Sequence, residues 1–258
     1  MTQRRRHFAI CSLAGVCFAA AQAPYGIWPL VVVGFATSVW LFKTSRTPKR
    51  AAWMGWAIGT TYFAASLTWI VEPFLVDIAR HGWMAPFALA GLAGGLALFW
   101  ALPFWMSARL GKPASLLALW PLAEYGRSTF FTGFPWGLQA YAWIDTPLAQ
   151  IAAWAGPHGL GSLTLILAAL PVLMTWTRGS AVALMGFAAL GTIGLLQQKN
   201  SANALADAPL IRLTQPNAPQ HQKWDPEFAP IFFRRLIDAT QAVPKPDLII
   251  WPETSLPN

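Results

Sequence analysis

The sequence predicts a polytopic α-helical membrane protein with about seven transmembrane helices, followed by the first βαβ portion of an extracytoplasmic α/β domain. Three observations support this fold class. Of the 258 residues, 55% are hydrophobic and only 11% are charged, whereas soluble proteins carry about 25% charged residues. Apolar runs long enough to cross a bilayer recur throughout residues 1–197. Residues 198–258 instead carry six basic and six acidic side chains, a composition typical of a water-exposed domain.

The predicted transmembrane region comprises seven apolar runs, to be compared with the roughly 20 residues that a membrane-spanning helix needs. They are Phe8–Ala23, Gly26–Phe42, Ala51–Val71, Met84–Ala108, Ala114–Tyr125, Leu160–Trp176 and Ala181–Leu196. The fifth is the weakest, because only 11 uncharged residues separate Lys112 from Glu124. This run is expected either to continue past its flanking charges or to lie partly at the membrane interface.

The first run has a second interpretation, as a secretory signal peptide. Three arginines at positions 4–6 precede a short apolar stretch that ends in Ala21-Gln22-Ala23, a small-residue cleavage pattern. Pro24 follows directly and the second apolar run begins almost at once. These features favour an uncleaved helical hairpin. Both interpretations give the later spans the same orientation, so topology does not separate them.

Lysine and arginine are distributed unequally between the two predicted sides of the membrane. With the N-terminus in the cytoplasm, the outer side of the membrane region carries only Arg80 and Arg127. The cytoplasmic side carries Arg4, Arg5, Arg6, Lys43, Arg46, Lys49, Arg50, Arg109, Lys112 and Arg178. This bias predicts that residues after 197 lie outside the cytoplasm. It also explains the net charge of +8, because the excess basic residues set the orientation in the membrane. No nucleic-acid partner is therefore expected.

A charged pair and an aromatic loop stand out near the fifth run. Glu124 and Arg127 are spaced i, i+3, which places them on one helix face within salt-bridge reach. Ionisable groups at membrane depth are functional candidates, and the alternative is that both are simply interfacial. The stretch 130–137 that follows contains four aromatic residues. It is predicted to be a loop at the outer face.

The tail has the pattern of a strand, a helix and a second strand. Pro209–Gln215 and Asp247–Trp251 read as strands, and their connection through a helix predicts a parallel pair. The helix is Phe228–Ala242, whose apolar residues near one face are Phe232, Phe233, Leu236 and Ile237. Glu253 follows the second strand at its carboxyl end, where reactive groups of α/β sheets gather. It is a candidate general base, or an ordinary loop carboxylate.

Five stretches, taken in order, cover nearly the whole chain and match one family. They are Pro24-Tyr25-x-x-Trp28-Pro29, Glu124-x-x-Arg127, Thr132-Gly133-Phe134-Pro135-Trp136, Gln220-x-x-Lys223-Trp224-Asp225 and Leu248-Ile249-Ile250-Trp251-Pro252-Glu253-Thr254. In these motifs the sequence resembles the bacterial apolipoprotein N-acyltransferases. Members of this family are multi-pass proteins of the bacterial inner membrane, with a periplasmic domain of the nitrilase, or carbon-nitrogen hydrolase, type.

The resemblance implies transfer of a fatty acyl chain from a phospholipid donor to the N-terminal, lipid-modified cysteine amine of an apolipoprotein acceptor. It implies a Glu-Lys-Cys triad without a cofactor, in which Glu253 is the general base. It places Trp224 in the acyl-substrate site, and Arg127 and Trp136 at the membrane-facing entrance. The family's catalytic lysine and cysteine follow the position of Glu253 by more than the five residues present here. We therefore expect residues 1–258 alone, a transmembrane domain (1–197) with a truncated nitrilase-like portion (198–258), to be inactive.

The sequence leaves two alternative functions beside this resemblance. A multispan transporter or lipid-binding membrane protein is one alternative, but only Glu124 and Arg127 are plausible charges at membrane depth and the chain shows no convincing repeat. An inactive truncated gene product is the other. No metal site is expected, because His7, His81, His158 and His221 lack ligand spacing. Cys11 and Cys17 share one apolar run and predict no disulfide framework.

Overall fold

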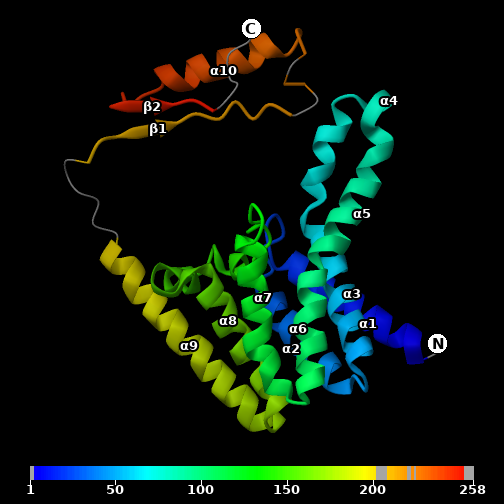
Figure 1. The fold of residues 1–258 in the computed structure, drawn as a ribbon. Coiled ribbons are helices and arrows are strands. Elements are labelled where there is room, and N and C mark those ends of the chain that lie inside the picture. Colours follow the sequence, from blue (N-terminus) through cyan, green and yellow to red (C-terminus); the bar gives the residue numbers. More distant parts are fainter. Residues whose placement is uncertain (1–2, 202–207, 220–221, 224, 253–258) are drawn as a thin grey trace. The chain divides into compact units, whose positions relative to one another are not determined.

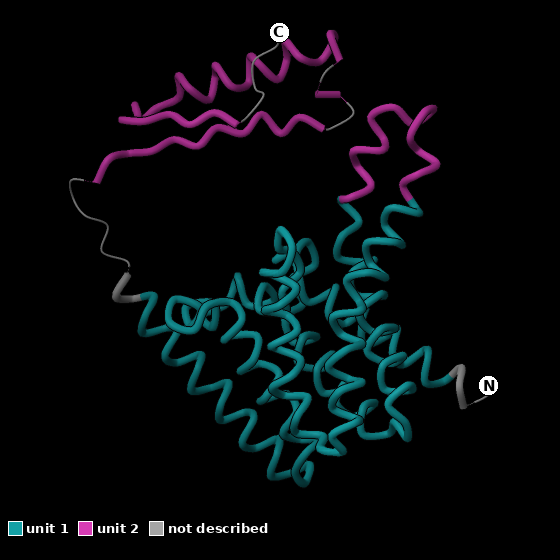
Figure 2. Tube along the Cα trace, viewed as in Figure 1, with its two compact units in different colours: residues 1–69, 86–201 teal, residues 70–85, 202–258 magenta. Residues whose placement is uncertain are grey.

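The computed structural model describes residues 3–201, 208–219, 222–223 and 225–252, and Figure 1 shows the elements that they form. The chain divides into two compact units. The first consists of residues 1–69 and 86–201, and the second of residues 70–85 and 202–258 (Figure 2). Each unit is described by itself. The domain boundary predicted at residue 197 falls inside the last helix of the first unit, which continues to Ser201.

The described residues before position 202 are almost entirely helical. The α-helices are α1 (Gln3–Ala20), α2 (Pro29–Thr44), α3 (Pro48–Ser66), α4 (Ile78–His81), α5 (Ala85–Leu96), α6 (Leu98–Leu110), α7 (Leu116–Thr129), α8 (Ala152–Leu173) and α9 (Trp176–Ser201). Short 3₁₀ turns connect them: η1 (Thr68–Leu75), η2 (Gly82–Met84), η3 (Pro113–Ser115), η4 (Gln139–Trp143) and η5 (Pro147–Ile151).

Each predicted span coincides with helix, although the lengths of these helices differ. Within the part of the chain that the structure describes, three helical stretches are long and apolar enough to cross a membrane: Ile78–Leu110, Pro147–Leu173 and Trp176–Gln198. Arg6–Ala20 and Pro29–Thr44 are shorter apolar helices. The predicted fifth span corresponds to α7, which has 14 residues. At about 1.5 Å per residue it rises about 21 Å, less than the roughly 30 Å hydrocarbon core, so a span at this position needs the segments on either side of α7 as well.

Six helices of the first unit form a closed ring of neighbours around an aromatic centre. Following the contacts around the ring, the order is α1, α3, α6, α7, α8 and α2, and α9 packs outside against α8. Fully buried rings fill the centre: Phe18, Phe35, Tyr62, Trp100 and Trp120. Trp100 and Trp120 meet edge to face with their ring centroids 4.9 Å apart, and Tyr62 stacks on Trp100 at 5.3 Å. Edge-to-face and offset stacking are the favoured geometries of aromatic pairs.

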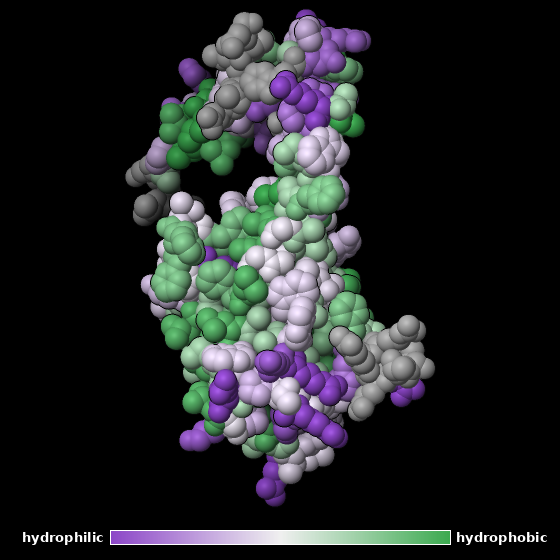
Figure 3. Space-filling view, turned by 45° about the vertical axis from the view of Figure 1, so that its right-hand side comes forward, coloured by the Kyte–Doolittle hydropathy of each residue, from purple (hydrophilic) through white to green (hydrophobic). Residues whose placement is uncertain are grey.

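The outer surface of the helical unit is rich in large apolar side chains. Exposed examples include Leu13, Leu98, Leu102, Leu184 and Met185. Figure 3 shows hydrophobic side chains over the flank of the unit and hydrophilic ones gathered at the end that holds the α2–α3 linker. Because a water-soluble surface exposes few such large contiguous apolar areas, this distribution fits a surface solvated by lipid.

Glycines let the helix backbones approach closely at two crossings. A Cβ atom at Gly15 of α1 would lie 2.6 Å from the carbonyl oxygen of Ile58 in α3. A Cβ atom at Gly55 of α3 would lie 2.6 Å from the carbonyl oxygen of Trp100 in α6. Small residues at such crossings are typical of helices that pack within membranes.

Replacing Gly55 with alanine is therefore expected to destabilise the unit by about 1–3 kcal/mol, the usual cost of overpacking. The new methyl group meets a backbone oxygen, which cannot rotate away as a side chain can. Thermal unfolding in detergent micelles measures the effect. Gly91→Ala is the matched control, because a Cβ there meets nothing within 4 Å. Equal melting temperatures for the two variants would contradict the prediction.

The second unit contains the strand–helix–strand pattern predicted for the tail. Strands β1 (Ile211–Leu213) and β2 (Leu248–Ile250) pair in parallel, in a register that aligns Ile211 with Leu248. Helix α10 (Ala229–Gln241) connects them. Of its predicted apolar face, Phe232 and Leu236 are buried and Phe233 and Ile237 are half-buried. The parallel pair and its helix are thus confirmed.

An arginine on β1 secures the end of α10. The Nη1 atom of Arg212 donates to the carbonyl oxygens of Ala239, Thr240 and Ala242, and Nη2 donates to that of Pro244 at 2.6 Å. The last carbonyls of a helix lack partners within the helix, and a cation near them is favourable. Arg212 therefore ties the helix to the strand that precedes it.

Candidate functional site

A buried ion pair on α7 is the centre of the candidate site. Arg127 Nη2 lies 2.8 Å from Glu124 Oε2, and Arg127 Nε donates to Glu124 Oε1 at 3.0 Å. Only 2% of Arg127 and 5% of Glu124 is exposed. The salt bridge predicted from the i, i+3 spacing is confirmed. Both side chains are enclosed by the protein, and neither reaches its surface.

Arg127 also holds the loop that follows its helix. Nη1 donates to the carbonyl oxygens of Phe134 at 2.5 Å and Trp136 at 2.8 Å, and Nη2 donates to that of Gly137 at 3.4 Å. Together with the two bonds to Glu124, these occupy all five N–H donors of the guanidinium. Arg127 therefore makes all of these hydrogen bonds inside the protein, to Glu124 and to the loop 130–137.

The anchored loop carries exposed aromatic side chains, as predicted. Phe131 is completely exposed and Trp136 is 55% exposed, and the Trp136 ring meets Trp69 at a centroid distance of 5.8 Å. The backbone is left-handed at Phe131, Gly133 and Gly137. Left-handed backbone of this kind is typical of tight turns. The result is a loop fixed from inside by Arg127 with aromatic rings on its outside.

A second set of hydrogen bonds fixes the far end of the same loop. The hydroxyl of Tyr62 donates to the carbonyl oxygen of Gly137 at 2.7 Å. Gln22 Nε2 donates to the Tyr62 hydroxyl oxygen and to the carbonyl oxygen of Leu138 at 3.0 Å. Gln22 lies in the Ala21-Gln22-Ala23 pattern that suggested a cleavage site. In the folded chain it is a buried part of the loop's support.

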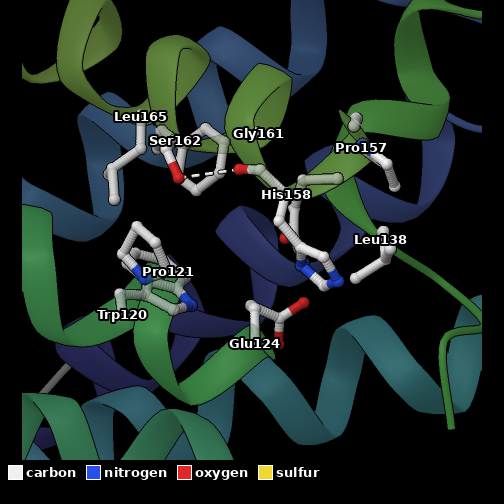
Figure 4. Close-up of a pocket in the computed structure, with 12 residues that line it drawn as sticks. Trp120, Pro121, Glu124, Leu138, Pro157, His158, Gly161, Ser162 and Leu165 are labelled. Atoms are coloured by element: carbon white, nitrogen blue, oxygen red, sulfur yellow. Dashed lines mark hydrogen bonds between the residues drawn. The ribbon is translucent and has the colours of Figure 1, made fainter. Parts of the chain in front are cut away.

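Glu124 lines a small pocket whose other walls are mostly apolar (Figure 4). Its Oε1 atom accepts a hydrogen bond from Trp100 Nε1 at 2.7 Å, and the ring of His158 lies across the pocket. Two further donors that line it, Trp120 Nε1 and Gln139 Nε2, are buried and have no partner among the described residues. The pocket has room for about one water molecule. It therefore suits an internal water and is too small for a lipid.

Comparisons with known proteins decide the family. Residues 14–170 match the model of the apolipoprotein N-acyltransferase N-terminal domain. The chain belongs to the apolipoprotein N-acyltransferase family. Curated relatives carry the name apolipoprotein N-acyltransferase in Caulobacter vibrioides (37% identical over 96% of this chain), Brucella suis (35% over 95%) and Rhodopseudomonas palustris (33% over 96%). The chain spans about half the length of these relatives: 50%, 51% and 51% respectively.

Of the four residues that the family resemblance singled out, the structure describes Arg127 and Trp136. Arg127 is buried and Trp136 is exposed on the loop that it holds. Glu253 and Trp224 lie outside the described residues. Trp251, two residues before Glu253, is described: its Nε1 donates to Thr240 Oγ1 on α10 at 2.9 Å. The roles of all four site residues stay predictions.

Sequence reasoning missed most of the surroundings of Glu124. Trp100, Gln139 and His158 come from α6, η4 and α8, and no local spacing links them to α7. Trp120 alone had a usable signal, since it precedes Glu124 by four residues on the same helix. Among the described residues, no group of three or more His, Cys, Asp or Glu side chains could hold a metal ion. Cys11 and Cys17 are free thiols, buried and half-buried.

Proposed function

We propose that this chain is the membrane part, with the first portion of the soluble domain, of an enzyme that transfers a fatty acyl chain. The donor is a phospholipid and the acceptor is the α-amino group of the lipid-modified N-terminal cysteine of an apolipoprotein. The observation that carries the proposal is similarity across 96% of the chain to a relative named for this activity. It runs through both the helical region and the tail that follows it.

The proposal includes an arrangement in the bacterial inner membrane. Seven spans place the N-terminus in the cytoplasm, and the tail begins a nitrilase-like domain in the periplasm. The unequal division of lysine and arginine, ten to two between the predicted sides, supports this orientation. The parallel strand pair with its connecting helix supports an α/β domain in the tail.

The proposed chemistry proceeds through a thioester. A cysteine thiolate attacks the carbonyl carbon of the donor's acyl ester, and the tetrahedral intermediate collapses to an acyl-thioester with release of a lysophospholipid. The acceptor amine then attacks the thioester, loses its proton, and releases the thiolate. Glu253 serves as general base at these proton transfers. The resemblance assigns the cysteine, and the lysine that stabilises the oxyanion, to positions after 258.

The membrane-facing parts of the proposed site are a substrate-contacting residue and a positioning residue. Trp136 is exposed on the loop 130–137 and is available to an acyl chain, as Trp224 is proposed to be in the soluble part. Arg127 is enclosed and fully hydrogen-bonded. We therefore assign it to positioning this loop, in place of direct contact with substrate.

A direct assay tests the proposed function. The enzyme of which this chain is proposed to be the first part is purified from its native membrane and mixed with a phospholipid that carries an isotopically labelled acyl chain and with a synthetic diacylglyceryl-cysteine peptide. We expect the peptide to gain the mass of one labelled acyl chain, with one lysophospholipid formed per transfer. A peptide whose amine is acetylated beforehand is the control and should gain nothing. Transfer to the blocked peptide, or none to the free one, would overturn the proposal.

Trp136 gives a more local test. Trp136→Ala is expected to lower kcat/KM for the phospholipid about tenfold, because burying an aromatic side chain against an acyl chain contributes about 1.5–3 kcal/mol. The melting temperature should hardly change, since Trp136 is 55% exposed. Trp154→Ala, on the exposed surface of α8, is the matched control and should retain activity. A large fall in melting temperature for Trp136→Ala would show a structural role instead.

A further inference from the structure

A groove between α1 and α3 opens on the surface at one end of the helical unit. Its volume is about 740 Å³, within the roughly 300–1,000 Å³ range of small-molecule sites. Apolar side chains from both helices line its length, and two basic residues at the start of α3 lie at its end. The lining includes Phe8, Cys11, Lys49, Arg50, Trp53 and Met54.

The two cations at this end of the groove have no carboxylate partner among the described residues. The sequence contains no aspartate or glutamate before Glu72, whereas the same stretch carries seven lysines and arginines. Lys49 is exposed and Arg50 is half-buried. In the described part of the chain, no carboxylate lies within ion-pair distance of either. Both cations are therefore available to an anion from outside the chain.

The start of α3 adds to the attraction for an anion. Thr47 caps the helix, its side chain accepting a hydrogen bond from the backbone N–H of Arg50 at 3.3 Å. The first turn of a helix carries a partial positive charge, and here Lys49 and Arg50 lie within it. The exposed ring of Trp53, one turn further on, has the amphipathic character that places tryptophan at the lipid headgroup level.

We propose that this groove binds an anionic phospholipid. Its phosphate pairs with Lys49 and Arg50, and an acyl chain lies along Phe8, Trp53 and Met54. Cationic residues next to an apolar channel match the two parts of such a lipid, and no carboxylate lines the groove to pair with the cationic headgroup of a zwitterionic one. Its assignment to the cytoplasmic leaflet rests on the orientation proposed above. The groove is separate from the loop 130–137 and uses none of the residues assigned to acyl transfer.

The test compares two lipids on the purified chain in detergent micelles. Native mass spectrometry counts the phosphatidylglycerol and phosphatidylcholine retained from an equimolar mixture. The wild-type chain should prefer phosphatidylglycerol at least tenfold, because each cation near an anionic headgroup contributes about fivefold in affinity. Lys49→Gln/Arg50→Gln should lower the preference to below about threefold.

Arg46→Gln/Lys112→Gln is the matched control. It removes two positive charges from the same predicted side, at positions outside the groove lining, and should keep the wild-type preference. No preference in the wild-type chain would overturn the proposal, and so would an equal loss in both double variants, which indicates diffuse attraction. If the groove variant does not fold, the single substitution Lys49→Gln, at an exposed position, should lower the preference for phosphatidylglycerol about fivefold. The readout involves no acyl transfer, so this proposal and the proposed function fail separately.

Discussion

Replacing Arg127 with leucine is expected to destabilise the helical unit by about 3–5 kcal/mol, the cost of leaving a buried charge without its partner. Glu124 would keep only the hydrogen bond from Trp100 in an otherwise apolar interior. The carbonyl oxygens of Phe134, Trp136 and Gly137 would lose their donor at the same time. Thermal unfolding in detergent micelles, monitored by circular dichroism, measures the loss.

Two further variants identify which part of this effect comes from the charge. Glu124→Leu/Arg127→Leu removes both charges and should recover part of the stability, but not the part due to the loop carbonyls. Arg109→Leu removes an exposed guanidinium from α6 and should change stability by less than about 1 kcal/mol, as is usual for surface positions. A stability of Arg127→Leu within 1 kcal/mol of the wild-type value would contradict the interior role of the pair.

Glu253→Gln is expected to lower the rate of acyl transfer by about 10²–10⁴-fold, the usual contribution of a general base. Glutamine keeps the size and polarity of the side chain but cannot accept the proton. The assay is the labelled-acyl transfer described above, carried out with the protein from its native membrane. Phospholipid binding should be unchanged, since the substitution affects the proton transfer rather than the contact area.

The control for this prediction is Glu227→Gln. Glu227 is an exposed carboxylate shortly before α10 and has no proposed part in the reaction. It tests whether the loss of any acidic residue from the tail slows transfer. Equal activities of the Glu253 and Glu227 variants would exclude Glu253 as the base and leave it an ordinary loop carboxylate.

Much of the secondary structure could be predicted from the sequence, because its signal is local. Long apolar runs located the helices of the first unit. In the tail, two short strand-like runs on either side of a segment with helical periodicity located β1, α10 and β2. The segment 72–83, between the predicted third and fourth spans, was not predicted to contain short helical turns. It contains Glu72, Asp77 and Arg80, and such polar positions carry no hydrophobic periodicity. The division of the predicted fourth span into α5 and α6 was missed for a similar reason, since both halves are equally apolar.

The candidate site was predictable only where its residues are close in the sequence. The Glu124–Arg127 pair lies on one helix turn, and the aromatic loop follows directly, so both could be found. The support from Gln22 and Tyr62 could not, because 116 residues separate Gln22 from its acceptor at Leu138. Such contacts depend on the order of helices around the ring, which hydropathy does not encode.

The place of Phe18 in the aromatic centre has a consequence for biosynthesis. Phe18 contacts Trp120 with ring centroids 6.1 Å apart, yet the ribosome makes Trp120 102 residues later. At about 5–20 residues per second this interval is roughly 5–20 s. During that time α1 has to remain in the bilayer without the partners that later enclose it. In the closed ring Ala21 and Gln22 are buried and Ala23 is exposed, so completion of the core encloses two of the three residues of the Ala21-Gln22-Ala23 sequence.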